Sequence, residues 1–219
     1  MSEAYLVAFD MDGTLLPINS SWEFVHKLLG TEEMASRYRR MYERGEIDYR
    51  KWAELDVSSW RERNFSTVLR EVENLRPVED AEEAVGRLKE EGFVVGLISS
   101  GLDVIAERLC NMLRMDFCRS AKLRIVDGRV LGILRELDPD RKSEELKDVA
   151  RRFGVPLRRV AFVGDGESDL SIFRMEIGKK IAFRPRSEVI RFLADHVVDS
   201  LSEAADILIE WKSSARIEH

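Results

Sequence analysis

Short apolar runs recur along this chain, and each is followed by a segment with helical periodicity. The runs predict buried strands at residues 5–10, 93–99, 159–163 and 180–183, with a further short strand at 196–198. Strands that alternate with helical segments favour a parallel sheet, because a parallel pair needs a long crossover connection, usually a helix. The pattern therefore predicts an α/β fold built on a doubly wound parallel sheet.

The segments between these strands have apolar positions three and four residues apart, as expected for helices that cover a sheet. We predict such helices at residues 79–91, 102–113, 141–153 and 201–211. One region breaks the alternation, because Asp127-Gly128 lies between two short runs of strand-forming residues, 123–126 and 129–131. This arrangement is typical of a hairpin with a two-residue turn, and we expect it to extend one side of the core as an antiparallel flap.

A long segment between the first two strands lacks a strand pattern. It contains four amphipathic helical stretches, at residues 21–29, 32–44, 49–60 and 66–73. We expect a small α-helical cap domain at residues 16–76, inserted into a discontinuous core made of residues 1–15 and 77–219. Trp60 is expected inside this helical bundle, and Trp22 is the better candidate for a pocket because it follows the first strand closely.

Two carboxylates follow the first strand, at Asp10 and Asp12. In open α/β sheets ligands bind at the carboxyl ends of the strands, and the i, i+2 spacing lets both side chains face one site while Met11 points back into the protein. One carboxylate can act as nucleophile and the other as general acid and base. An Asp-rich turn without a chemical role is the alternative, but paired carboxylates are costly to bring together without a cation.

The segment Asp10-Met11-Asp12-Gly13-Thr14 resembles the opening motif of the haloacid dehalogenase superfamily, whose phosphatases carry Asp-x-Asp-Gly-Thr after their first strand. Three further segments match that superfamily in the same order along the chain. These are Ser99-Ser100-Gly101 after the second strand, Lys142 at a helix start, and Gly164-Asp165-Gly166-Glu167-Ser168-Asp169 after the third strand. The last resembles Gly-Asp-Gly-x-Asn-Asp, with Ser168 in place of the usual Asn. The resemblance covers essentially the whole chain and implies a Rossmann-like core with a cap inserted after the first strand.

This resemblance implies a mechanism of phosphoryl transfer. Asp10 would attack the phosphorus of a phosphomonoester and form an aspartyl-phosphate. Asp12 would protonate the departing oxygen and then activate the water that hydrolyses the intermediate. Ser99, Lys142 and the main-chain N–H of Ser100 would bind the phosphate oxygens. Because dehalogenases lack the second acid and transport ATPases carry Thr there, Asp12 indicates a phosphatase or a phosphomutase.

The same resemblance implies a metal site. Asp10, Asp165 and the main-chain carbonyl of Asp12 would bind the metal, and Asp169 would be a nearby ligand or support those that bind it. Four carboxylates that converge with a dianionic substrate make a hard divalent cation close to obligatory, and ligation by oxygen alone suits Mg²⁺. We therefore expect Mg²⁺ as the cofactor.

Within the superfamily the likeness is closest to phosphoserine phosphatases with a C1-type helical cap, but the substrate-reading positions differ. Asn19 stands where those enzymes have a Glu for the substrate ammonium, and simple alignment places Asp56 where they have an Arg for the carboxylate. Glu23 and Arg50 could substitute from neighbouring positions, and Trp22 could line the pocket. We expect a hydrolase of a small phosphorylated metabolite. Phosphoserine phosphatase proper, a phosphomutase or phosphotransferase with the same residues, and a silent phospho-ligand-binding domain stay open.

The composition of the chain argues against some classes of binding partner. The 219 residues are 44% hydrophobic and 35% charged, as in a globular protein, and the net charge of −6 without a basic stripe argues against nucleic-acid binding. No apolar stretch reaches membrane-spanning length and no signal-peptide pattern is present, so we expect no membrane partner and a cytoplasmic location. Cys110 and Cys118 lack metal-binding spacing and are expected to be reduced. The oligomeric state, monomer or homodimer, is left open.

Overall fold

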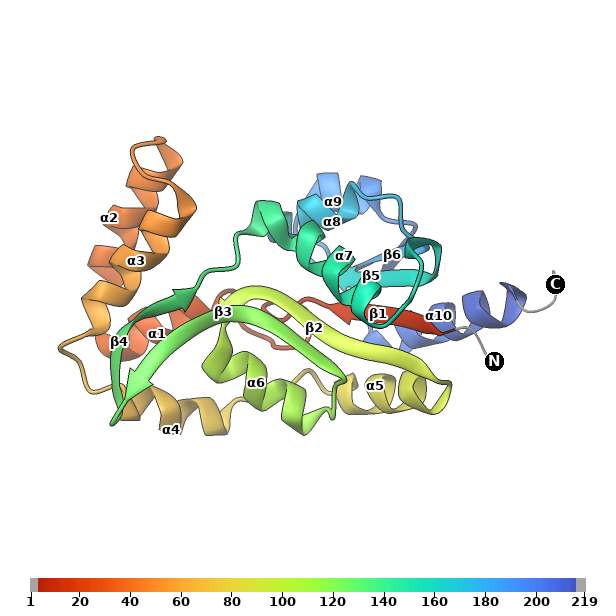
Figure 1. Ribbon diagram of the computed structural model, residues 1–219, viewed down its shortest axis with the longest axis horizontal. Helices are drawn as coiled ribbons and strands as arrows, with labels where there is room; N and C mark the ends of the chain where they lie inside the picture. The colour runs from red at the N-terminus through yellow and green to blue at the C-terminus, as the bar shows by residue number, and fades with distance from the viewer. Residues whose placement is uncertain (1–3, 216–219) are drawn as a thin grey trace.

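The computed structural model describes residues 4–215 and contains one seven-stranded sheet (Figure 1). The strands stand in the order β4-β3-β2-β1-β5-β6-β7, and every neighbouring pair is parallel except β3 with β4. Their bounds are β1 Tyr5–Phe9, β2 Phe93–Leu102, β3 Phe117–Val126, β4 Arg129–Arg135, β5 Val160–Gly164, β6 Lys179–Phe183 and β7 His196–Val198. The predicted α/β fold with a doubly wound, mostly parallel sheet is confirmed.

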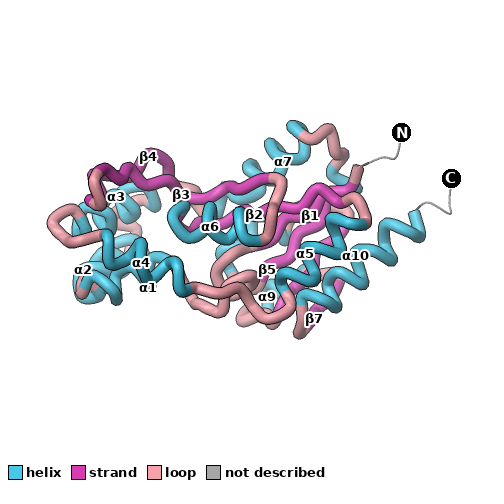
Figure 2. The backbone as a smooth tube through the Cα atoms, turned by 90° about the horizontal axis from the view of Figure 1, so that it is seen from below, coloured by secondary structure: helices cyan, strands magenta, loops and turns pink. Residues whose placement is uncertain are grey.

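Helices cover both faces of this sheet (Figures 1 and 2). One face carries α5 Ala81–Glu90, α6 Asp103–Met112 and α10 Leu201–Ala215; the other carries α7 Lys142–Arg152, α8 Leu170–Phe173 and α9 Glu188–Leu193. The central strand β1 shows why both layers are needed. Val7 and Phe9 pack into the apolar cluster of one face, and Leu6 and Ala8 pack into the cluster of the other. Because side chains alternate along a strand, only two covering layers bury all of them.

The antiparallel hairpin is longer than predicted. Strand β3 begins at Phe117 and pairs first with β2 in parallel, and its outer part then pairs with β4 and packs the hairpin against the cap helix α3. Asp127 and Gly128 form the two-residue turn with φ angles of 49° and 70°. Both angles lie in the left-handed region that such a turn needs, so the predicted turn is confirmed.

Five helices are inserted between β1 and β2, and the four that precede α5 pack against one another. These four are α1 Ser21–Leu29, α2 Glu32–Glu43, α3 Tyr49–Trp60 and α4 Ser66–Asn74. Trp60 is fully buried among them, whereas α2 buries none of its residues completely and lies at the far end of the molecule (Figure 1). The N–H of Val78 donates to the carbonyl of Leu15 at 2.9 Å. This hydrogen bond brings the two ends of the inserted segment together at the edge of the core.

Short elements complete the chain. The helices α8 and α9 were not predicted, because four and six residues are too few to show a helical period. Three short 3-10 helices join longer elements: η1 Pro139–Arg141, η2 Leu157–Arg159 and η3 Glu167–Asp169. Cys110 and Cys118 are both free thiols. Within residues 4–215, every helix is too short or too polar to cross a bilayer.

Candidate active site

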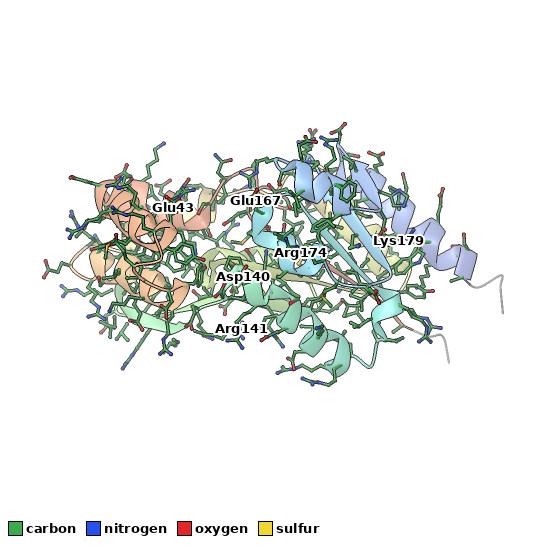
Figure 3. All side chains as sticks on the ribbon, turned by 90° about the horizontal axis from the view of Figure 1, so that it is seen from above. Glu43, Asp140, Arg141, Glu167, Arg174 and Lys179 are labelled. Carbon is green, nitrogen blue, oxygen red and sulfur yellow. The ribbon has the colours of Figure 1, made fainter. Side chains whose placement is uncertain are left out.

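The carboxyl ends of β1, β2 and β5 meet at one edge of the sheet and gather the four sequence motifs. Asp10 follows β1, Ser99 lies near the end of β2, and Asp165 follows β5 directly. Lys142 reaches the same edge from the first position of α7. In Figure 3, Asp140 and Glu167, which neighbour two of these motifs in sequence, lie between the cap helices and the sheet. The site therefore faces the cap.

Lys142 is the central cation of this site. It is fully buried, and its Nζ atom lies 2.8 Å from Asp10 Oδ1 and 2.5 Å from Asp169 Oδ1. Burial opposes the lysine's charge, but Asp10 and Asp169 outweigh that effect and hold the pKa of Lys142 above its usual value. The lysine thus stays charged and fixes one oxygen of each carboxylate.

Three of the carboxylates form a compact cluster. Asp10, Asp165 and Asp169 are buried, and each offers an oxygen such that all three atoms lie within 4.8 Å of one another. Burial, followed by the nearby charge of Asp10, raises the pKa of Asp165 to about 6 and that of Asp169 to about 7. Oxygen ligands in this density fit a hard divalent cation, which would remove the repulsion that raises these pKa values. The structure thus contains a buried aspartate triad whose oxygens are grouped as a metal ion requires.

The Asp12 side chain turns away from this cluster towards the cap. Its Oδ2 atom accepts hydrogen bonds from the main-chain N–H of Ser21 at 2.7 Å and from Ser21 Oγ at 2.8 Å. Burial raises the pKa of Asp12 to about 7, although both Ser21 contacts act to lower it. Its other oxygen, Oδ1, is buried and makes no hydrogen bond with any described residue. A carboxyl that titrates near neutral pH can both give and take a proton, as a general acid and base must.

Ser99 and Ser100 lie near the carboxyl end of β2, beside the aspartates. Ser99 Oγ accepts the N–H of Gly101 at 3.1 Å, so its own proton is available to a ligand. Ser100 Oγ is buried without a hydrogen-bond partner in residues 4–215, and the Ser100 carbonyl accepts the indole N–H of Trp22 at 3.0 Å. Two polar side chains at the end of β2 thus lie ready to bind oxygen atoms.

Gly13 shows how tightly the loop after β1 packs. Its φ angle is 82°, and a Cβ atom there would collide with the carboxylate of Asp165. The same Cβ would also lie 2.9 Å from Nη2 of Arg186. Glycine is therefore required here both for its backbone conformation and for the space it leaves free.

Arg186 is a residue of this site that the sequence reasoning missed. Its Nη2 lies 2.6 Å from Asp165 Oδ2, and its Nη1 donates to Asn19 Oδ1 at 3.2 Å. It follows the end of β6 by three residues, so a rule that inspects every strand end could have found it. Arg186 links a carboxylate of the metal cluster to Asn19, one of the predicted specificity positions.

A cavity of about 690 Å³ opens beside the site, between the cap helices and Arg186. Asn19, Trp22 and Glu23 line it, as their candidate role in specificity requires. Arg50 does not: its side chain is 71% exposed, pairs with Glu54, and borders a smaller pocket of about 370 Å³. The amphipathic pattern of α3 could not show which face of the helix meets a cavity.

Most residues of the cavity wall were not proposed as specificity candidates from the sequence, among them His26, Tyr49, Trp52 and Asp56. His26 and Asp56 are buried side chains of different cap helices, and His26 Nε2 lies 3.3 Å from Asp56 Oδ1. Burial raises the pKa of the Asp56 carboxyl. Asp56 is therefore a buried acid beside the cavity. Simple alignment places it where the similar phosphoserine phosphatases have an arginine.

The fold and site define a phosphohydrolase-type α/β enzyme with a helical cap. Residues 7–174 match the haloacid dehalogenase-like hydrolase family, and the chain belongs to that family. It is 28% identical to a phosphoserine phosphatase of Methanocaldococcus jannaschii over 97% of this chain and 95% of that protein. A phosphoserine phosphatase of Archaeoglobus fulgidus is 32% identical over 88% of this chain, but the match spans 56% of that longer protein.

A solved structure, a phospho-aspartyl intermediate analogue of phosphoserine phosphatase, shares the fold. It superimposes with a TM-score of 0.75 at 27% identity, covering 90% of this chain and 94% of that chain. The protein is thus a phosphatase similar to phosphoserine phosphatases, as the motifs predicted.

Proposed function

We propose that the protein hydrolyses a small phosphomonoester with Asp10 as nucleophile and Mg²⁺ as cofactor. The observation that carries this is the position of Asp10, which is held by Lys142 at 2.8 Å and belongs to the buried aspartate cluster. Lys142 pairs with one oxygen of this carboxylate and limits its rotation, so the other oxygen stays available for attack on phosphorus. When bound, the metal ion supplies positive charge to the phosphate oxygens and to the nucleophile.

Asp12 moves the proton in this proposal. Its carboxyl, with a pKa of about 7, gives a proton to the departing oxygen in the first step. The resulting carboxylate then takes a proton from the water that attacks the aspartyl-phosphate. Ser21 holds Oδ2 of Asp12 through two hydrogen bonds, so Oδ1, which lacks a partner among the described residues, is the atom that exchanges the proton.

Phosphate binding is assigned to Ser99, Ser100 and Lys142. Ser99 has an uncommitted hydroxyl proton, Ser100 offers its main-chain N–H and a buried hydroxyl, and Lys142 carries a charge that nothing in solvent screens. Phosphoryl transfer depends mainly on positioning and charge neutralisation, which these groups provide without covalent chemistry of their own. The proposed metal ligands are Asp10, Asp165, Asp169 and the main-chain carbonyl of Asp12.

We further propose a substrate other than phosphoserine, although the similar proteins are phosphoserine phosphatases. Asn19 is exposed and accepts a hydrogen bond from Arg186, so no carboxylate is available there for an ammonium group. Asp56 is a buried acid in the cavity wall and opposes a substrate carboxylate nearby. Residues 16–76 are proposed to form the cap domain, residues 1–15 and 77–219 the core, and the enzyme to act in the cytoplasm without nucleic acid or membrane.

Phosphate release from a panel of phosphomonoesters, with and without Mg²⁺, tests this function. We expect Mg²⁺-dependent turnover of p-nitrophenyl phosphate and of small metabolite esters, with phosphoserine a poor substrate. Acid quenching of the reaction followed by mass spectrometry should place a phosphoryl group on Asp10. Release of no phosphate from any ester would contradict the proposal, and transfer of the phosphoryl group to a second position of the substrate would identify a mutase instead.

A further inference from the structure

The cavity beside Arg186 has aromatic walls. Trp22, Tyr49 and Trp52 line it, and a volume of about 690 Å³ lies in the range of sites for ligands of drug size, ~300–1,000 Å³. Tyr42 stacks on Trp52 with ring centroids 4.7 Å apart, and Tyr49 meets Trp52 edge-on at 5.9 Å. These contacts hold Trp52 in one orientation before any ligand arrives. The cavity therefore suits a leaving group whose carbon skeleton can pack against these rings.

Buried polar atoms among the lining residues are incompletely bonded. Trp52 Nε1 makes no hydrogen bond with any described residue, although the atom is out of contact with solvent. Asp56 Oδ1 lies 3.3 Å from His26 Nε2, without the angles of a hydrogen bond. Leaving a buried donor unpaired is costly, so such an atom in a residue that lines a cavity points to a partner supplied by a ligand.

The His26 ring behind Asp56 is held by other cap residues. Its Nδ1 atom lies 2.8 Å from Thr31 Oγ1 and 3.2 Å from Trp60 Nε1, and its Nε2 atom faces Asp56. The carboxylate of Asp56 accepts hydrogen bonds, and the indole N–H of Trp52, one turn earlier on α3, can only donate.

This pair of groups discriminates between ligand chemistries. An ammonium group would satisfy Asp56 but leave the N–H of Trp52 unpaired, and a carboxylate would satisfy Trp52 but face the acid. A hydroxyl group donates and accepts at once, so it satisfies both. Sites built to bind a hydroxyl reject analogues without it strongly, because the buried groups then lose their partner.

We propose that the leaving group is a sugar or polyol, with one hydroxyl bound by Trp52 and Asp56 and the carbon skeleton packed on the aromatic walls. The proposal rests on the phosphatase function proposed above. It makes Trp52 and Asp56, which line the cavity together with Arg186 and Asn19, the residues that determine specificity.

Turnover by the full chain with Mg²⁺ gives the first test. The panel contains ribose 5-phosphate, glucose 6-phosphate and sorbitol 6-phosphate, with phosphoserine and phosphoethanolamine as the ammonium-bearing competitors. We expect at least one sugar or polyol phosphate to exceed both competitors by tenfold or more in kcat/KM. Preference for phosphoserine or phosphoethanolamine overturns the proposal.

Variants of the chain test whether Trp52 causes the substrate preference. Trp52→Phe keeps the ring on Tyr42 but removes the N–H, and we expect a loss of about 10- to 100-fold in kcat/KM for the preferred ester. Hydrolysis of p-nitrophenyl phosphate, which has no hydroxyl to read, should change less than about twofold. Trp211→Phe makes the same change on α10, against Tyr5 and far from the cavity, and should alter neither. Equal losses with both esters in Trp52→Phe overturn the assignment.

A binding measurement separates this proposal from the proposed function. The Asp10→Asn variant is expected to bind without turnover, and calorimetric titration with the same panel and Mg²⁺ should retain the preference for sugar or polyol phosphates. Asp56→Asn added to it should weaken that binding while thermal unfolding stays cooperative. If p-nitrophenyl phosphate is not hydrolysed, the phosphatase function fails. If the sugar and polyol phosphates bind no better than phosphoserine, the cavity assignment fails whatever the turnover.

Discussion

The catalytic edge of the core and the cavity of the cap differ in whether their buried polar groups have side-chain partners. At the edge, Lys142 contacts Asp10 and Asp169, and Ser21 binds Asp12. In the cavity, the indole N–H of Trp52 has no partner among the described residues. In the proposed mechanism, the groups that perform chemistry are held by other side chains before a substrate binds, whereas the group proposed to select the substrate has no such partner. The exceptions at the edge, Asp12 Oδ1 and Ser100 Oγ, are atoms assigned to the reaction or the phosphate.

The largest effect is expected at the nucleophile. Asp10→Asn keeps the shape of the side chain but removes the attacking carboxylate, and we expect kcat to fall by about 10⁴-fold or more. Phosphate release with p-nitrophenyl phosphate measures it. Asp127→Asn is the matched control, because Asn also adopts the left-handed conformation of that hairpin turn and activity should not change. Appreciable activity in Asp10→Asn would place the nucleophile elsewhere.

Lys142 tests whether pairing at the catalytic edge is needed for both stability and chemistry. Lys142→Ala leaves Asp10 and Asp169 buried without their cation, and we expect a loss of about 3–5 kcal/mol in the free energy of unfolding without metal. The rate should fall by about 10²- to 10³-fold. Urea denaturation and steady-state kinetics measure the two effects. Lys147→Ala, on the exposed side of the same helix, should leave both within error.

Metal removal should make stability depend on pH in a defined direction. The pKa values of Asp12, Asp165 and Asp169 are raised from 3.8 to between about 6 and 7. The folded metal-free protein therefore keeps protons that the unfolded chain has lost, and stability falls as the pH rises from about 4 to 7. Mg²⁺ binds the ionised carboxylates, so it should raise the Tm more at pH 8 than at pH 5.

Thermal unfolding of the chelator-treated protein, with and without Mg²⁺, measures this difference. Asp165→Asn should reduce the stabilisation by Mg²⁺ at pH 8, because one ligand of the proposed site is gone. The same rise in Tm at both pH values would show that the ion does not compete with these protons.

Ser21 is the cap residue that binds the proposed general acid, Asp12. Its substitution should give the smallest change in activity. Ser21→Ala removes the hydroxyl that lowers the pKa of Asp12 but keeps the main-chain N–H, so we expect kcat for alkyl phosphates to fall about tenfold. The alkaline limb of the pH profile should move upward. Nitrophenyl phosphate, whose leaving group needs no proton, should be affected less. Ser58→Ala, on an exposed part of α3, is the control and should change neither quantity.

The sequence predicted the catalytic edge well because parallel strands deliver their ends to one place. Asp10, Ser99 and Asp165 each follow an apolar run, so their convergence needed no knowledge of side-chain contacts. The cavity was harder, because a helical period does not show what the side chains of a helix such as α3 face. Strand β3 was cut short for a related reason: Arg119 and Ser120 interrupt its apolar pattern, although Arg119 pairs with Ile98 of β2.

The hydrogen bond from Val78 to Leu15 brings the two ends of the inserted segment to one place. The chain leaves the core after β1 and returns to almost the same place, so the strands on either side need not move to accommodate what lies between. Such a segment can be exchanged as a cassette. Grafting residues 16–76 of this chain onto a related phosphatase should transfer its substrate range while the recipient keeps its own reaction chemistry.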